Sequence, residues 1–194
     1  YINEGYKGNL PSCDNVFTLT AALFNKVAQT DTPQGVIAVA KMPCYSLDII
    51  KSGVSVICDN VRDPGNLGTI IRTAHAVGAA AVILTKGSVD PYNMKTVRAS
   101  MGSVFALPVL YADIAEIEYL RKSGVSIYSG TLHKDSVSIY ALSMSGSCAF
   151  VIGNEAEGVS DSMIEISDRL FTIPMPGGAE SLNASVAASV CLNE

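Results

Sequence analysis

Residues 54–85 read "VSVICDNVRDPGNLGTIIRTAHAVGAAAVILT" and predict two strands joined by one helix. The outer parts, residues 54–60 and 80–85, are short apolar runs rich in β-branched residues, as in buried strands. The segment between them, residues 66–79, has apolar side chains at helical spacing: Leu67, Ile70, Ile71, Ala74 and Val77. A strand, a helix and a second strand in this order are typical of a parallel pair of strands.

The same alternation continues toward the C-terminus. Two helices are predicted, one at 91–102 with a proline at its start, and one at 113–124 with an aspartate cap and a glycine stop. Residues 103–110 are predicted to be extended. Three more strands follow, with a helix after each of the last two: "VSIYSGT" (125–131), "CAFVIGN" (148–154) and "RLFTIP" (169–174). This order indicates an α/β domain with a mainly parallel sheet flanked by helices.

The first fifty residues have a different pattern. A helix in "NVFTLTAALFNKVAQ" is followed by a turn at "DTPQG" and by a predicted strand, "VIAVA" (36–40). We expect a boundary near residues 45–52, which gives two parts, 1–50 and 51–194. The chain begins at Tyr1 instead of Met, so we expect further residues upstream.

Composition limits the class of protein. Of the 194 residues, 48% are hydrophobic and 16% are charged, which is typical of a globular protein with a large core. There is no signal-peptide pattern and no apolar run long enough to span a membrane, so a cytoplasmic protein is expected. The five cysteines are scattered without a CxxC spacing, which predicts buried free thiols in a reducing compartment. With only two histidines besides, no metal site is predicted.

The charge is unevenly distributed along the chain. The net charge is −5, but residues 1–98 carry 9 basic and 7 acidic side chains, while residues 99–194 carry 4 basic and 11 acidic ones. A polyanion would therefore bind to the first half of the chain. Five basic side chains lie between positions 62 and 98 there: Arg62, Arg72, Lys86, Lys95 and Arg98. An ordinary solvated face explains the same charges equally well.

Three loops that each follow a predicted strand have unusual chemistry: "DNVRDPGNLG" (59–68), "GNEAEGVS" (153–160) and "PMPGGAESLNAS" (174–185). In parallel sheets, ligands bind at the carboxyl ends of strands, in the loops that lead to helices. The chain has no GxxxxGK[ST], GxGxxG or GxSxG pattern, which disfavours P-loop, dinucleotide-binding and hydrolase sites. The three loops are therefore the candidate site.

Several polar residues of these loops could carry chemistry. Asn66 is predicted to cap the first helix, and Arg72, near the protein body, could hold a phosphate, stabilise an oxyanion or form a structural salt bridge. Glu157 could interact with the positive end of the next helix, accept hydrogen bonds from a sugar hydroxyl, or orient an arginine. Ser181 is predicted to cap the last helix, with Asn183 on its first turn.

The stretches "DNVRDPGNLGTIIRTAHAVGA", "VIGNEAEGVS" and "IPMPGGAESLNASVAASV" resemble, in order, the three motifs of the SpoU-like (TrmH) RNA ribose 2′-O-methyltransferases of the SPOUT superfamily. The resemblance covers about residues 54–192. "TDTPQGVIAVA" also resembles the junction with the family's N-terminal RNA-binding extension. Residues 1–50 would then be the C-terminal remnant of a substrate-binding domain plus a linker.

The resemblance implies a C-terminal deep trefoil knot, the cofactor S-adenosylmethionine, an rRNA or tRNA substrate, and a homodimer. The implied cofactor-binding residues are Thr131, Leu132, Gly153, Asn154, Gly158, Ile173, Met175 and Leu182. The implied catalytic residues are Asn66, Arg72, Glu155, Ser181 and Asn183. Arg72 would grip the RNA phosphate and stabilise the developing 2′-oxyanion, whereas the general base stays open.

This chain departs from the family at two places, since Asn154 stands where many relatives have a small residue, and the third loop is a glycine-rich variant. Three alternatives remain: a knotted RNA-binding protein without catalysis, a knotted methyltransferase that modifies bases, and a nucleotide-dependent oxidoreductase. The intact polar motif residues disfavour the first, and the lack of GxGxxG disfavours the last.

Overall fold

In the computed structural model, the segments predicted at 54–60 and 80–85 are neighbouring parallel strands, β3 (Val54–Cys58) and β4 (Ala81–Leu84). Helix α2 (Pro64–Ala76) joins them, as predicted. The model describes residues 1–10, 12–50 and 52–193, so Lys51 and Glu194, the ends of the predicted catalytic part, lie outside the described residues. The chain divides into two compact units, Tyr1–Pro43 and Cys44–Glu194.

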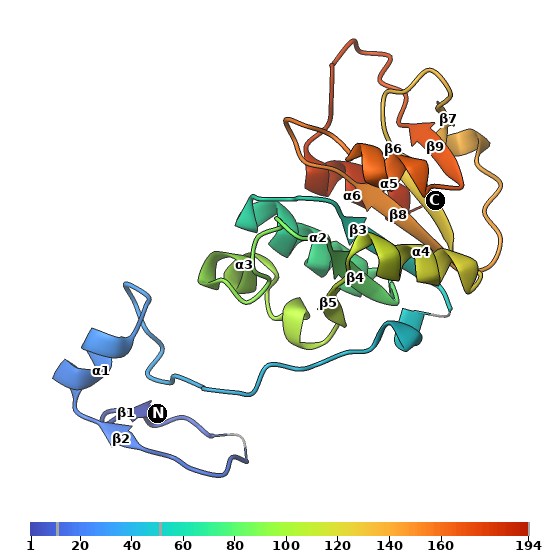
Figure 1. Cartoon of the computed structure of the whole chain (residues 1–194). Helices are drawn as coiled ribbons and strands as arrows, with labels where there is room; N and C mark the ends of the chain where they lie inside the picture. The colour runs from blue at the N-terminus through green and yellow to red at the C-terminus, as the bar shows by residue number, and fades with distance from the viewer. Residues whose placement is uncertain (11, 51, 194) are drawn as a thin grey trace. The chain divides into compact units, whose positions relative to one another are not determined.

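The larger unit is built on one parallel sheet (Figure 1). Its other strands are β5 (Val109–Tyr111), β6 (Ser126–Gly130), β7 (Val137–Ser138), β8 (Cys148–Ile152) and β9 (Arg169–Thr172). The order across the sheet is β5-β4-β3-β8-β6-β9-β7, and each pairing that the structure describes is parallel. The prediction of a mainly parallel sheet is confirmed, and β7 is a strand that the sequence did not predict.

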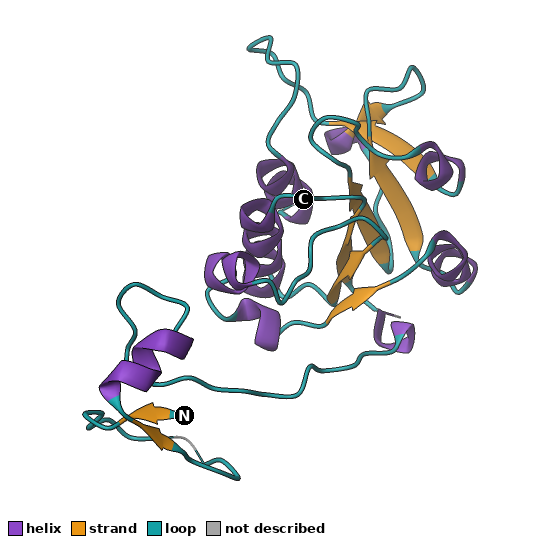
Figure 2. Cartoon of the chain, turned by 60° about the vertical axis from the view of Figure 1, so that its left-hand side comes forward, coloured by secondary structure: helices purple, strands orange, loops and turns teal. Residues whose placement is uncertain are grey.

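Helices cover both faces of this sheet, as Figure 2 shows. One face packs against α2, α3 (Met94–Ala99) and α6 (Ala184–Leu192). The other packs against α4 (Ile114–Lys122), α5 (Asp161–Glu165) and the 3₁₀ turn η1 (Leu47–Ile50). Two further 3₁₀ turns are η2 (Ser103–Phe105) and η3 (Ile139–Ala141). These two buried layers make the domain a three-layer α/β structure.

Small residues let the helices of the first face approach closely. A Cβ placed on Gly68 of α2 would lie 2.5 Å from the Cβ of Ala99 and 2.7 Å from the backbone oxygen of Thr96, both on α3. Helix α6 packs against α2 and β8, with Ala184 and Ala188 buried in the contact. The small residues of α6 therefore form a surface that packs closely on the domain.

The caps of two site helices differ from the prediction. Asp63 is the N-cap of α2, since its Oδ1 accepts a hydrogen bond of 2.7 Å from the backbone N–H of Asn66, and Pro64 occupies the first turn. Asn183, not Ser181, caps α6, because its Oδ1 accepts from the backbone N–H of Ser185 at 2.9 Å. Asn66 and Ser181 are thus not used as caps.

Three other local predictions need correction. Helix α3 spans only Met94–Ala99, because the side chain of Asn93 caps it after the turn that contains Pro91. Residues 103–110, predicted to be extended, begin with η2 before β5. Residues 36–40 are not a strand, because the pairing described for them is one isolated bridge, Val36 with Ile2, whose neighbouring hydrogen bonds join Ile37 to Tyr1.

The smaller unit contains a two-stranded parallel sheet, β1 (Ile2–Asn3) and β2 (Thr18–Leu19), and helix α1 (Ala21–Val27). The predicted helix in this part is present, with Thr20 as its N-cap. Phe24 of α1 is fully buried.

Candidate functional site

Strands β3 and β8 bring the first two candidate loops side by side. Cys58 pairs with Ile152 at the ends of these strands, so Asp59 and Gly153 both begin their loops at the same edge of the sheet. Because the strands are parallel, both loops project from the carboxyl edge, where ligands bind in such sheets.

The loop from 153 to 158 is a tight turn closed by its own backbone. The N–H of Asn154 donates to the oxygen of Gly158 at 3.0 Å, and the N–H of Gly158 donates back at 2.9 Å. Gly158 has a φ of +74°, which favours glycine. A Cβ on Gly153 would lie 2.2 Å from the carbonyl carbon of Gly158. Glycine at position 153 therefore lets the backbone of Gly158 approach closely, so that the loop can close on itself.

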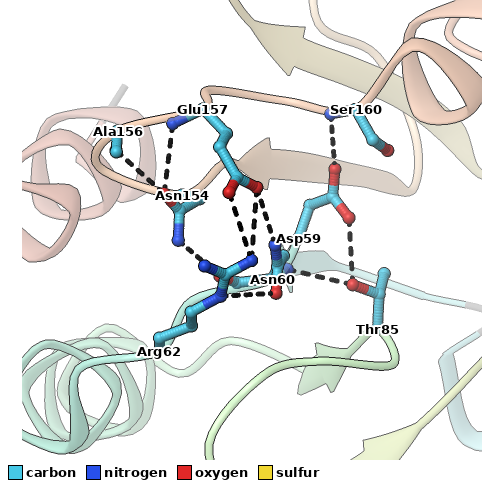
Figure 3. Close-up of polar contacts among 8 residues, drawn as sticks. All are labelled: Asp59, Asn60, Arg62, Thr85, Asn154, Ala156, Glu157 and Ser160. Carbon is cyan, nitrogen blue, oxygen red and sulfur yellow. Dashed lines mark hydrogen bonds and ion pairs between the residues drawn. The ribbon is translucent and has the colours of Figure 1, made fainter.

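Asn154 fixes this loop from inside. Its side-chain oxygen accepts from the N–H groups of Ala156 at 2.8 Å and Glu157 at 3.1 Å (Figure 3). Its amide donates to the backbone oxygen of Asn60 at 2.9 Å. The residue is buried, so these bonds satisfy groups that water does not reach. A small residue at this position could make none of these bonds.

Glu157 orients an arginine, one of the three predicted alternatives. Both of its carboxylate oxygens lie 3.3 Å from Nη2 of Arg62. The Nδ2 of Asn60 also donates to Glu157, at 3.1 Å, and Asn60 accepts from Nε of Arg62 at 3.2 Å (Figure 3). Glu157 precedes α5, which begins at Asp161, and the hydrogen bonds described for its carboxylate go to Asn60 and Arg62 and not to the first turn of that helix.

Asp59 is a buried acid that the sequence analysis missed. Its carboxylate accepts from the hydroxyl of Thr85 at 2.9 Å and from the N–H of Ser160 at 2.7 Å, so it joins the loops after β3, β4 and β8. Burial, with the nearby charges of Asp59 and Glu155, raises the pKa of the Cys58 thiol well above its usual range. Its position directly after a predicted buried strand is the sequence signal that could have identified Asp59.

Three of the five predicted catalytic residues form one chain of hydrogen bonds. The side-chain amide of Asn66 donates to Oε1 of Glu155, and the amide of Asn183 donates to Oδ1 of Asn66 at 2.9 Å. Each residue comes from a different loop, so the three motifs meet at this point. The two asparagines and the carboxylate hold one another's orientation.

A pocket of about 420 Å³ lies beside this chain, at the carboxyl ends of β6, β8 and β9. It is lined by all eight residues predicted for the cofactor, and also by Glu155 and Ser181. Further lining residues, none of them predicted for the cofactor, are Gly130, Ile152, Ala156, Glu157, Phe171, Thr172, Glu180, Ala184, Ala187 and Cys191. The size falls within the range of small-molecule sites.

The pocket contains acidic side chains and no basic one within the described lining. The acids are Glu155, Glu157 and Glu180. Leu132, Ile173 and others supply apolar walls. Such a lining suits a ligand with positive charge and an apolar body, and disfavours a polyphosphate.

Arg72 is not part of this pocket. It lies on the exposed side of α2 and, among the described residues, makes no hydrogen bond or ion pair within the chain. Its neighbours Ile70 and Ile71 point into the core, whereas the helical turn places Arg72 on the side of Thr69, so the expected position near the protein body is wrong. His75, one turn later, contacts the hydroxyl of Ser103 at 3.1 Å through Nδ1.

Three of the five cysteines are buried in the structure and two are exposed. Cys58, Cys148 and Cys191 are buried and free, but Cys13 and Cys44 are exposed, so the prediction of burial fails for these two. Within the described residues, no group of three or more potential ligands could hold a metal ion. No helix in the described part of the chain is long and apolar enough to cross a membrane.

Residues 53–193 match the model of the SpoU rRNA Methylase family. The chain belongs to this family. This SpoU chain is 38% identical over 175 residues to the 23S rRNA (guanosine(2553)-2'-O)-methyltransferase RlmP of Bacillus subtilis, covering 90% of this chain and 69% of the relative. It is 34% identical to the 23S rRNA (uridine(2479)-2'-O)-methyltransferase of Streptomyces viridochromogenes, covering 86% of this chain and 61% of the relative. The recognised resemblance is confirmed.

The fold has a close counterpart among solved structures. The AdoMet-bound rRNA methyltransferase from Sinorhizobium meliloti superposes with a TM-score of 0.84 at 36% identity, covering 90% of this chain and 69% of that one. This SpoU chain thus spans about two thirds of the length of the relatives it matches.

Proposed function

We propose that this SpoU chain transfers a methyl group from S-adenosylmethionine to a ribose 2′-hydroxyl of 23S ribosomal RNA. The names of the similar methyltransferases support the substrate, and the AdoMet complex of the Sinorhizobium enzyme supports the cofactor. Because rRNA is the proposed substrate, we place the protein in the cytoplasm.

The acidic lining of the pocket carries the proposal. When bound, S-adenosylmethionine supplies a methyl group activated by a positively charged sulfur. Three glutamates and no described basic side chain surround the space, and apolar walls such as Leu132 and Leu182 can hold an adenosyl group. The residues present therefore fit this cofactor, while NAD and ATP would bring phosphates to a negative site.

The chain's own residues would position the RNA hydroxyl. A hydroxyl is a weak nucleophile, so its developing negative charge needs stabilisation. Asn66 and Asn183, locked by Glu155, can donate and accept hydrogen bonds at the rim of the pocket. Ser181 lines the pocket and can bind the ribose or the cofactor. We assign to Arg72 the grip on the RNA phosphate and the stabilisation of the oxyanion, and we assign no residue as the general base.

The position of Arg72 supports a homodimer. Within one chain Arg72 is exposed and lies outside the pocket, so a second subunit offers a route to bring it to a reacting ribose. Large apolar side chains are exposed after α3, with Met101 73% and Phe105 62% accessible. We expect sedimentation to give a dimer at micromolar concentration, and a monomer would contradict this part of the proposal.

The strand order also supports the trefoil knot expected from the family. Strand β9 pairs with β6, whereas α6 packs against β8 and α2, so the segment between β9 and α6 must cross the end of β6. We propose that this crossing closes the knot. We also propose that residues 1–50 are the remnant of an RNA-binding domain and its linker.

Methylation of a 23S rRNA transcript tests the function. With radiolabelled S-adenosylmethionine, digestion of the RNA to nucleosides should give a 2′-O-methylnucleoside. Arg72→Ala should lower the rate by about 10²-fold or more, as for the loss of one oxyanion donor, and the affinity for S-adenosylhomocysteine should be unchanged. A methylated base would favour the base-modifying alternative. A parental rate for Arg72→Ala would refute the role of this residue.

A further inference from the structure

Arg62 and the loop that carries Lys86 both contact Asn60, whose side chain is hydrogen-bonded to the pocket residue Glu157. Nε of Arg62 donates to Oδ1 of Asn60 at 3.2 Å. A Cβ on Gly87 would lie 2.5 Å from the same oxygen, so the loop after β4 touches Asn60 from the other side. Lys86 immediately precedes this glycine, is exposed, and has no hydrogen bond or ion pair among the described residues. Arg62 and Lys86 therefore lie on neighbouring loops, after β3 and β4, at the carboxyl edge of the sheet.

Glu157 links these cations to the pocket. It lines the pocket and forms an ion pair with Arg62, in which both side chains are about 60% exposed, 59% for the arginine and 60% for the glutamate. An exposed ion pair contributes little net free energy, so another anion can replace the carboxylate easily. Glu157 and Asn60 thus orient the guanidinium without burying it, and a planar guanidinium suits bidentate contact with a phosphate.

The acidic groups nearby are already engaged. Asp59 is buried and bonded to Thr85 and Ser160, and Asp63 caps α2. Asp90 accepts a hydrogen bond from the N–H of Tyr92. At the exposed edge, Glu157 is therefore the carboxylate that competes directly for Arg62.

We propose that Arg62 and Lys86 bind a backbone phosphate of the RNA strand that enters the pocket, and that Glu157 holds Arg62 in position until this phosphate replaces it. The proposal rests on the proposed function, since it names a contact that the same RNA substrate would make. It assigns a role to two basic side chains that neither line the pocket nor belong to the hydrogen-bonded chain of Asn66, Glu155 and Asn183.

The salt dependence of RNA binding by the whole chain tests this site. A fluorescent single-stranded RNA is titrated by anisotropy between about 50 and 200 mM salt, where each lost phosphate contact makes the slope of log K against log salt shallower by about 0.7. Arg62→Gln and Lys86→Gln should each make the slope shallower by this amount, and the double variant should make it shallower by about 1.4. Glu157→Gln should bind RNA about two- to fivefold more tightly, because Arg62 is no longer neutralised.

Lys122→Gln is the matched control. Lys122 pairs with Glu118 at the end of α4 that leads into the start of β6, at the opposite edge of the sheet. This variant should keep the parental slope, because it removes the same charge away from the site.

A second measurement separates this site from a structural role of the ion pair. The affinity for S-adenosylhomocysteine should be parental in Arg62→Gln, Lys86→Gln and Lys122→Gln, because none of these three residues lines the pocket. The proposal would be overturned if Arg62→Gln and Lys86→Gln kept the parental salt dependence of RNA binding, whether or not their affinity for S-adenosylhomocysteine changed. It would also be overturned if the parent chain bound no RNA. Methylation by the parent is measured separately, so a catalytically silent chain with the expected slopes would refute the proposed function and keep the phosphate site.

Discussion

Loop 153–158 and loop 174–182 both line the pocket, but they are held very differently. The first is closed by two backbone hydrogen bonds and by the side chain of Asn154, and it is joined to the loop after β3 through Arg62. The second makes, among the described residues, one hydrogen bond, from the N–H of Gly178 to the oxygen of Met175 at 3.0 Å. One wall is thus preorganised, whereas the other can adjust to a ligand.

The largest expected effect comes from a matched pair of glycine substitutions. Gly153→Ala would place its Cβ 2.2 Å from the backbone of Gly158, so the fixed loop must shift, and the free energy of unfolding should fall by about 1–3 kcal/mol. Gly177→Ala, in the other loop, has nothing within 4 Å and should unfold as the parent does. Denaturant unfolding measures both, and parental stability of Gly153→Ala would break the contrast.

A pair of polar substitutions should separate stability from function. Asn154→Ala removes the hydrogen bonds inside the fixed loop and should cost about 1–2 kcal/mol of unfolding free energy. Ser181→Ala should leave unfolding unchanged and lower methyl transfer, because Ser181 is exposed and lines the pocket. Equal destabilisation by both would show that the two loops are held alike.

Hydrogen exchange should sharpen the same contrast residue by residue. The amide of Gly158 donates within the fixed loop and should exchange slowly in the free protein. Amides of residues 176–181 should exchange fast, and should slow when S-adenosylhomocysteine binds. Fast exchange at Gly158, or no response of residues 176–181 to saturating ligand, would contradict this expectation.

The smallest expected effect concerns the thiols. Cys191 lines the pocket from α6, and burial raises its pKa to about 12. The raised pKa keeps this thiol protonated, and therefore unreactive, at pH 8. Alkylation at pH 8 should therefore modify Cys13 and Cys44 fast and the three buried cysteines only on unfolding, and a third fast thiol in the native protein would contradict this.

Local patterns in the sequence were sufficient for most of the larger unit. The apolar runs that became β3, β4 and β8 are nearly continuous, as is typical of buried parallel strands. The errors arose where two local signals compete. Asp63 and Asn66 can both cap a helix, and Pro64 favours the earlier start. In the smaller unit, residues 36–40 have strand composition, but the pairing described for them stops after Val36, which bridges Ile2, and Ile37, which exchanges backbone hydrogen bonds with Tyr1.

The site was predicted less completely because its contacts are distant in the sequence. Arg62 and Glu157 are 95 positions apart, and their pairing follows only when β3 and β8 are known to be neighbours. The role of Asn154 could be recognised only from the conformation of its own loop, because its side chain bonds to backbone groups within that loop. Arg72, by contrast, could have been placed on the exposed side of α2 from the helical period alone.

The most direct test of the account is a calorimetric titration of the chain with S-adenosylhomocysteine, with NAD and ATP as controls. The residues that line the pocket all lie between 130 and 191. We predict binding of S-adenosylhomocysteine at one site per chain and no heat from NAD or ATP. No binding of S-adenosylhomocysteine to folded protein, or binding of NAD instead, would contradict the assignment of this pocket to S-adenosylmethionine.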